Sequence, residues 1–162
     1  MNRSDLGYHP ALMTDMYHPD SAYVSWRAAK NGMTTFDLYV RQAPFGGAYL
    51  LVAGLEVALE YVRDFHFTDE DLAFLAQIRD YDPAFLDMLG RLRFTGEILA
   101  MPEGSVAFPN EPLIRVTAPF REAMLLESGL LQAMNFATLV ATKSARIAWA
   151  ARVRPVAEFA LD

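Results

Sequence analysis

A helical pattern of apolar residues from Phe120 to Ala151 constrains the fold of this chain more than any other feature. Its breaks are Gly129 and the polar residue Asn135, so we expect two consecutive helices that join near Asn135. The stretch without a charged residue, from Ser128 to Thr142, is too short to cross a bilayer and contains Gln and Asn. We therefore expect these helices to belong to a folded domain rather than to a membrane.

Short β-rich runs punctuated by Pro and Gly precede the helical region. Residues 34–41 alternate apolar and polar side chains as a half-buried strand does, and residues 48–54 form a second β-rich run. The intervening "APFGG" predicts a turn, so we expect these two runs to pair as a hairpin. Three further runs between residues 94 and 119 predict more antiparallel strands, and residues 153–162 predict a last strand.

Three shorter helices are expected between the strands. Apolar residues recur at helical spacing through residues 55–65. Thr68 and Asp71 have the spacing of a capping box, which predicts a helix that starts at Asp69. Pro83 after Asp82 predicts a further helix start, because Pro at the first helical position loses no intrahelical hydrogen bond. Helices mixed with antiparallel strands make the expected fold class α+β.

Composition narrows the class of protein. The chain has 162 residues and 53% hydrophobic residues, which is typical of one folded domain. Its net charge of −6 argues against nucleic acid and anionic membranes as partners. There is no cysteine and no apolar leader at the N-terminus, so we expect a cytoplasmic protein without disulfides. The three histidines, His9, His18 and His66, lack the spacing of metal ligands, and we expect no metal site.

Two places carry candidate chemistry. Asp15 and Tyr17 in "TDMYHP" either form a structural turn or present a phenol ring for stacking, with Asp15 orienting it. Lys143 and Arg146, with Arg152 and Arg154, form the one basic cluster of an acidic chain. A solvated helix end is the favoured interpretation of that cluster, and a wall that faces phosphate is the alternative.

Several segments together resemble nicotinate phosphoribosyltransferase, in order and from about Ala11 to Leu161. The most specific are "RFTGEILAMPEGSVAFPNEPLIRV" and "NFATLVATKSAR". They are joined by "ALMTDMYHP", "TTFDLYVRQAPFGGAYLLVAGLEVALEYV", "YDPAFLDML" and "VAEFALD".

The resemblance implies an enzyme of NAD salvage that converts nicotinate and phosphoribosyl diphosphate to nicotinate mononucleotide, coupled to ATP hydrolysis and with Mg²⁺. It implies an N-terminal mixed α/β portion of a type II phosphoribosyltransferase in residues 1–118 and connecting helices in 119–152. Residues 153–162 would then begin an α/β barrel that is otherwise missing. Family members work as head-to-tail dimers, so we expect a homodimer or a partner that supplies the barrel.

The resemblance also assigns site residues. Tyr17 occupies the family's "TDxY" position and would stack on the pyridine ring across the dimer interface, with Asp15 beside it. Phe159 in "EFALD" matches "EFGLRR", where the Phe covers the other face of the ring. Here Ala160 replaces that Gly, and no Arg follows, which leaves recognition of the substrate's anionic group unassigned.

Barrel residues, including the histidine that accepts phosphate from ATP, cannot be assigned to this chain. We therefore expect an N-terminal fragment that is inactive alone. The alternatives are a non-catalytic module that docks on an intact phosphoribosyltransferase, and a relative that acts on nicotinamide or quinolinate.

Overall fold

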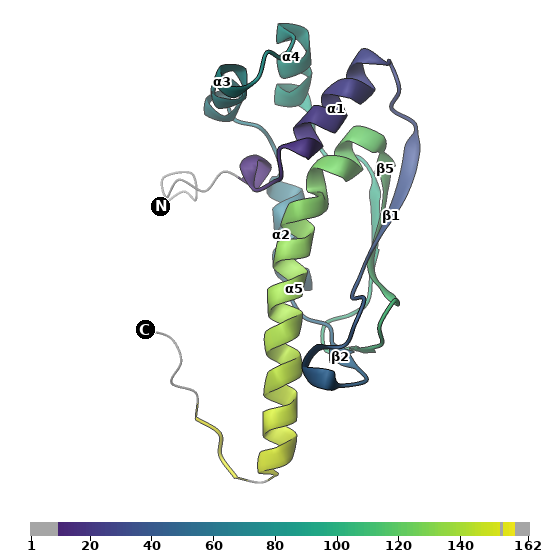
Figure 1. Ribbon diagram of the computed structural model, residues 1–162, viewed down its shortest axis with the longest axis vertical. Coiled ribbons are helices and arrows are strands. Elements are labelled where there is room, and N and C mark those ends of the chain that lie inside the picture. Colours follow the sequence, from purple (N-terminus) through teal and green to yellow (C-terminus); the bar gives the residue numbers. More distant parts are fainter. Residues whose placement is uncertain (1–9, 153, 158–162) are drawn as a thin grey trace.

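The computed structural model describes residues 10–152 and 154–157, and one long helix organises them (Figure 1). This helix, α5, runs along the molecule, with the strands on one side of it and α1, α3 and α4 gathered at one end. The helices are α1 (Tyr17–Arg27), α2 (Leu55–Asp64), α3 (Asp69–Ile78), α4 (Pro83–Arg91) and α5 (Phe120–Ala151), with short 3₁₀ turns η2 (Pro10–Leu12) and η3 (Pro44–Gly46). The strands are β1 (Met33–Tyr39), β2 (Leu50–Leu51), β3 (Glu97–Ala100), β4 (Val106–Ala107) and β5 (Pro112–Pro119). The expected α+β class is confirmed.

The strands form two antiparallel sheets, in the orders β1-β5-β3 and β2-β4. The expected hairpin between residues 34–41 and 48–54 is therefore wrong. β1 pairs with β5, with Phe36 opposite Val116, whereas β2 pairs with β4. The alternation in residues 34–41 specified a half-buried strand but not its partner. β5 is the better partner because it is the apolar central strand of its sheet, with four buried residues.

α5 is a single unbroken helix, so the expected joint near Asn135 is also wrong. Asn135 lies on the exposed side of the helix, where a polar side chain needs no break in the backbone. Gly129 is buried against the ring of Tyr61 from α2. A Cβ at position 129 would lie 2.1 Å from Cζ of Tyr61, so this glycine permits close packing of the two helices instead of ending one.

Two buried threonines attach α5 to the segment around β2. The Thr142 hydroxyl accepts a hydrogen bond from the Leu51 amide at 2.9 Å and donates one to the Thr138 carbonyl at 2.6 Å. The Thr138 hydroxyl accepts from the Ala53 amide at 3.2 Å and donates to the Ala53 carbonyl at 3.0 Å. Side chains of the helix thus satisfy backbone groups that a neighbouring strand would otherwise pair.

The three predicted short helices form as α2, α3 and α4, whereas α1 was not predicted. The Thr68 hydroxyl accepts from the Asp71 amide at 3.1 Å, and the Asp71 carboxylate accepts from the Thr68 amide at 2.8 Å, which confirms the capping box of α3. Asp82 accepts from the Ala84 amide at 2.8 Å and caps α4. Phe85 and Leu89 of α4 are fully buried, and α3 and α4 pack against each other.

The predicted strand over residues 153–162 falls largely outside the described residues, and so does Phe159. Residues 154–157, which are described, have no strand conformation.

By length and composition alone, one helix, Phe120–Ala151, is apolar enough to cross a membrane. The core helix of a globular protein passes the same test, and α5 packs on α1, α2, β1, β2 and β5. These contacts make α5 the core helix of the fold.

Candidate active site

Tyr17 is the first residue of α1, and 50% of its surface is exposed to solvent. Its hydroxyl donates a hydrogen bond of 3.2 Å to Oε1 of Glu127, which lies in the second turn of α5. Burial is the largest cause that raises the pKa of Tyr17, followed by the negative charge of Glu127. The phenol is thereby fixed at its hydroxyl, while the ring stays available for contact.

His18 is fully buried behind Tyr17 and shares its partner. Its Nε2 lies 3.1 Å from Oε2 of Glu127, and its Nδ1 lies 2.9 Å from Oγ1 of Thr14. The rings of Tyr17 and His18 are 3.9 Å apart between centroids. Glu127 therefore links two consecutive residues of α1 to α5, and this network holds the start of α1 in place.

Asp15 lies at the same junction on the exposed side. Its Oδ2 accepts a hydrogen bond from the Ser128 hydroxyl at 3.4 Å, a long distance for such a bond. Asp15 and Tyr17 are thus both tied to α5, by Ser128 and Glu127 respectively. The structure brings these two predicted residues together at one corner of the molecule.

An open groove of about 710 Å³ runs from Tyr17 along the exposed side of α1. Val24 and Phe120 give it apolar walls, while Asp20 and Ser21 supply polar groups. A flat aromatic ligand fits such a groove best when an aromatic side chain offers it a face. The arrangement can bind and orient a planar ring, but the described part of the groove holds one basic side chain, Lys30.

Lys143 and Arg146 lie well away from this groove, against the 44–49 turn. The guanidinium of Arg146 donates to the Phe45 carbonyl at 3.2 Å and lies 5.9 Å from the ring centroids of Phe45 and Tyr49. A Cβ at Gly47 would lie 1.3 Å from Nη2 of Arg146, so the absence of a side chain there leaves room for the guanidinium. Nζ of Lys143 is 5.6 Å from the Phe45 ring centroid. Their role toward phosphate stays a prediction.

Sequence reasoning missed Glu127, which the structure places at the centre of the Tyr17 network. No spacing rule could find it, because 109 positions separate it from His18. The "TDMYHP" motif groups His18 with Asp15 and Tyr17 in an active site, but its burial between two hydrogen-bond partners gives His18 a structural role. Within residues 10–152 and 154–157, no three His, Cys, Asp or Glu side chains come together as a metal ion requires.

Comparison with known proteins places this fold in a class. The crystal structure of human nicotinic acid phosphoribosyltransferase superposes with a TM-score of 0.83 and 40% sequence identity, over 89% of this chain and 30% of that one. A nicotinate-nucleotide pyrophosphorylase from Pyrococcus furiosus shares the fold, with a TM-score of 0.69 and 18% identity. The fold is that of the N-terminal portion of a type II phosphoribosyltransferase.

Sequence comparison narrows the class to one family. The family model for the nicotinate phosphoribosyltransferase N-terminal domain matches residues 12–135. A nicotinate phosphoribosyltransferase of Mycobacterium tuberculosis is 38% identical over 149 residues, which are 92% of this chain and 32% of that protein. One from Bacillus subtilis is 44% identical over 138 residues, which are 85% and 28% of the two proteins. The chain belongs to the nicotinate phosphoribosyltransferase family and spans about a third of the length of these relatives.

Proposed function

We propose that this chain supplies the N-terminal wall of the nicotinate site of a nicotinate phosphoribosyltransferase. The observation that carries the proposal is the half-exposed ring of Tyr17, fixed by Glu127 at the edge of an open apolar groove, in a chain of this family. In this proposal the ring of Tyr17 stacks on the pyridine ring, and Asp15 lies beside it. Phe159 would cover the opposite face of the pyridine.

The reaction we propose joins nicotinate to the phosphoribosyl group of phosphoribosyl diphosphate, in the cytoplasm and with ATP and Mg²⁺. Among the described residues, no three His, Cys, Asp or Glu side chains form a cluster that would hold a metal ion by themselves. We therefore assign Mg²⁺, ATP and the ribose diphosphate to residues beyond those described. The chain's own residues would bind and orient the pyridine ring and exclude water from one face of it.

The net charge of the chain supports the proposal that other residues bind the diphosphate and the metal. Departure of diphosphate creates a highly anionic leaving group, which an enzyme stabilises with concentrated cations and a metal. This chain has a net charge of −6, and the guanidinium of Arg146 in its basic cluster already donates to the Phe45 carbonyl. We propose that catalysis needs the barrel portion, either from a longer form of this chain or from a partner in a head-to-tail dimer.

Steady-state synthesis of nicotinate mononucleotide tests the proposal. The chain alone, given nicotinate, phosphoribosyl diphosphate, ATP and Mg²⁺, should form no product above background. The same chain joined to, or mixed with, the barrel portion of a family member should restore synthesis. Steady product formation by the purified 162-residue chain, or no recovery in an assembly shown to be intact, would contradict it.

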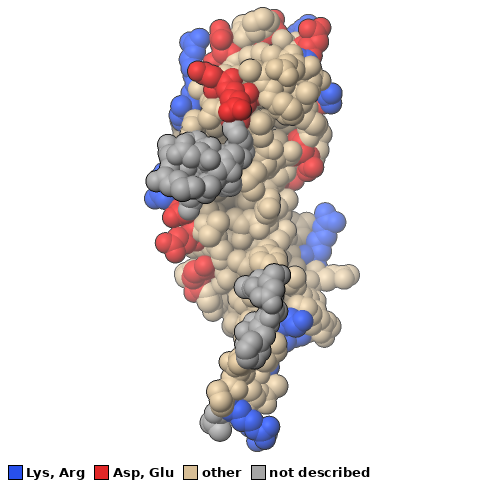
Figure 2. All heavy atoms as spheres, turned by 90° about the vertical axis from the view of Figure 1, so that its left-hand side faces the viewer, with Lys and Arg blue, Asp and Glu red and all other residues tan. Residues whose placement is uncertain are grey.

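A second candidate function follows from the exposed apolar side of α5. Phe136 is 72% exposed, and Val140, one helical turn further along the same side, is 46% exposed. Figure 2 shows that the middle of this side of the molecule is largely uncharged, with acidic and basic side chains together toward one end and basic ones toward the other. A non-catalytic module that docks on an intact phosphoribosyltransferase would use such a surface. This function would be favoured if the chain binds an intact phosphoribosyltransferase but restores no synthesis when it is joined to, or mixed with, the barrel portion.

Substrate choice is a separate part of the proposal. Nicotinate carries a carboxylate that nicotinamide lacks, and quinolinate carries two. The reconstituted enzyme should prefer nicotinate in a three-way competition, whereas preference for either of the others would reassign the substrate but leave Tyr17 in its stacking role.

A further inference from the structure

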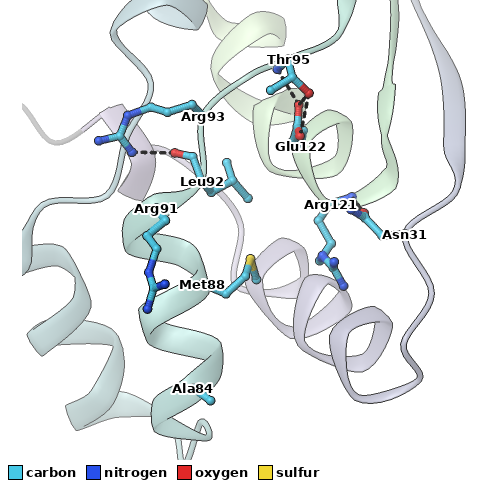
Figure 3. Close-up of a pocket in the computed structure, with 9 residues that line it drawn as sticks. All are labelled: Asn31, Ala84, Met88, Arg91, Leu92, Arg93, Thr95, Arg121 and Glu122. Carbon is cyan, nitrogen blue, oxygen red and sulfur yellow. Dashed lines mark hydrogen bonds between the residues drawn. The ribbon is translucent and has the colours of Figure 1, made fainter.

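A second cavity, of about 510 Å³, opens between α4, the start of α5 and the residues that precede β3 (Figure 3). Three arginines line it: Arg91 at the end of α4, Arg93 just after it, and Arg121 in the first turn of α5. It shares no lining residue with the groove beside Tyr17. In Figure 3, the side chains of Arg91 and Arg121 come from opposite walls, with Met88 between them.

Arg91 and Arg121 have no carboxylate partner among the described residues. The ion pairs formed by arginines in that part of the chain involve Arg63, Arg79 and Arg115. Arg121 is partly buried, and this burial lowers its pKa without a neighbouring anion to offset the effect. A desolvated cation without a counter-charge is unfavourable, and a bound anion would remove that cost.

The other polar groups of the cavity are compatible with an anion. Oδ1 of Asn31 accepts from the Arg121 backbone amide at 3.1 Å, so the side-chain NH₂ group remains as a donor. Glu122 is the one carboxylate in the lining, and both of its oxygens accept hydrogen bonds from Thr95, at 2.7 to 3.1 Å. Nη1 of Arg93 donates to the carbonyls of Gly90 and Leu92, which holds this guanidinium against the end of α4.

We propose that this cavity binds the phosphate or diphosphate group of a small molecule, held between the guanidinium groups of Arg91 and Arg121. Two planar forks of donors suit a group with several oxygens around one phosphorus better than a single carboxylate. A protein with a net charge of −6 has no general affinity for anions, so binding of diphosphate requires a local group of cations such as the one in this cavity. The proposal does not depend on the function of Tyr17.

Calorimetric titration of the chain with inorganic diphosphate tests the site directly. One site per chain is expected, and Arg91→Gln and Arg121→Gln should each weaken binding by about tenfold, because each removes one charge-assisted contact. Arg63→Gln is the matched control, because Arg63 is an exposed arginine on α2 that pairs with Glu60. It should leave the affinity within about twofold of the parent chain.

Two further measurements keep the test decisive. Arg121→Lys retains the charge without the planar fork and should lose less affinity than Arg121→Gln, which separates charge loss from misfolding. Acetate at the same ionic strength should not compete with diphosphate. The proposal is overturned if diphosphate does not bind at millimolar concentration, if acetate competes equally, or if Arg63→Gln weakens binding as much as the cavity variants. Circular dichroism on each variant verifies its fold.

Discussion

Glu127 accepts a hydrogen bond from the hydroxyl of Tyr17 at 3.2 Å, across 110 positions of sequence. The other oxygen of the same carboxylate contacts His18, so one side chain of α5 fixes two neighbours at the start of α1. Burial, and then the charge of Glu127, raises the pKa of Tyr17. The orientation and the protonation of Tyr17 therefore depend in part on the same distant residue.

Replacement of Glu127 by Gln should lower the pKa of Tyr17 toward its ordinary value. The carboxylate disfavours the phenolate by charge repulsion, and the amide keeps an acceptor while removing that charge. Titration of ¹³Cζ-labelled tyrosines by NMR, with Tyr17→Phe to assign the signal, measures this pKa. Glu56→Gln on α2 is the control, since Glu56 is not among the groups that shift Tyr17. An unchanged pKa in Glu127→Gln would show that burial and the charge of Asp15 raise the pKa without Glu127.

Replacement of Tyr17 by Ala should raise the KM for nicotinate in the reconstituted enzyme, because one face of the pyridine loses its stacking partner. A rise of about tenfold corresponds to roughly 1.4 kcal/mol, within the range of aromatic stacking. Tyr17→Phe keeps the ring and should leave KM nearer the parent value. Thermal unfolding should change little in both, since the ring is half exposed. Equal KM values for Ala and Tyr would exclude the stacking role.

Replacement of Gly129 by Ala should destabilise the fold by about 1–3 kcal/mol, because the new Cβ would overlap the ring of Tyr61. The gain in helix propensity, about 1 kcal/mol, is too small to offset a contact of 2.1 Å. Urea unfolding followed by circular dichroism measures the difference. Gly32→Ala is the control, because a Cβ there meets no atom within 4 Å. If Gly129→Ala proves as stable as Gly32→Ala, α2 and α5 pack less tightly than the structure indicates.

Replacement of Thr142 by Val should cost about 1–3 kcal/mol, because the Leu51 amide loses its acceptor inside the protein. Thr138→Val should have a similar effect through Ala53. Hydrogen exchange at Leu51 and Ala53 measures the loss locally, and urea unfolding measures it globally. Thr35→Val is the matched control, because the Thr35 hydroxyl forms a hydrogen bond with the Thr117 hydroxyl on the exposed side of the sheet. Unaltered exchange at Leu51 in Thr142→Val would contradict this account.

Local signals in the sequence predicted α2, α3 and α4 but not α1. The start of α3 followed from Thr68 and Asp71, because a capping box involves residues three positions apart. Strand pairing did not follow, because the partner of Phe36 lies 80 positions away and several apolar runs were available. The predicted joint at Asn135 was wrong because Asn135 lies on the exposed side of α5. A polar residue interrupts an apolar helical pattern only where that side of the helix is buried. The division at residues 118 and 152 stays a prediction.

The candidate site was predictable only as far as resemblance reached. The family motif led to Tyr17 and Asp15, and the structure places them at one junction with α5. Glu127, which anchors Tyr17, carries no local signal and required the folded chain. The basic cluster and the "PFGG" turn were treated as separate features, yet Arg146 occupies the space beside Gly47. Packing of a side chain against a distant glycine has no periodicity that a sequence pattern could display.

The unbroken course of α5 sets a fixed spacing between its two ends. Glu127 and Arg146 are nineteen residues apart on one helix, and a rise of 1.5 Å per residue separates them by about 28 Å along its axis. A rigid rod of that length prevents one pyridine nucleotide from reaching the Tyr17 corner and the Arg146 end of the same protomer together. If both ends serve catalysis, they belong to two different reaction centres, and the length of the helix fixes the distance between those centres.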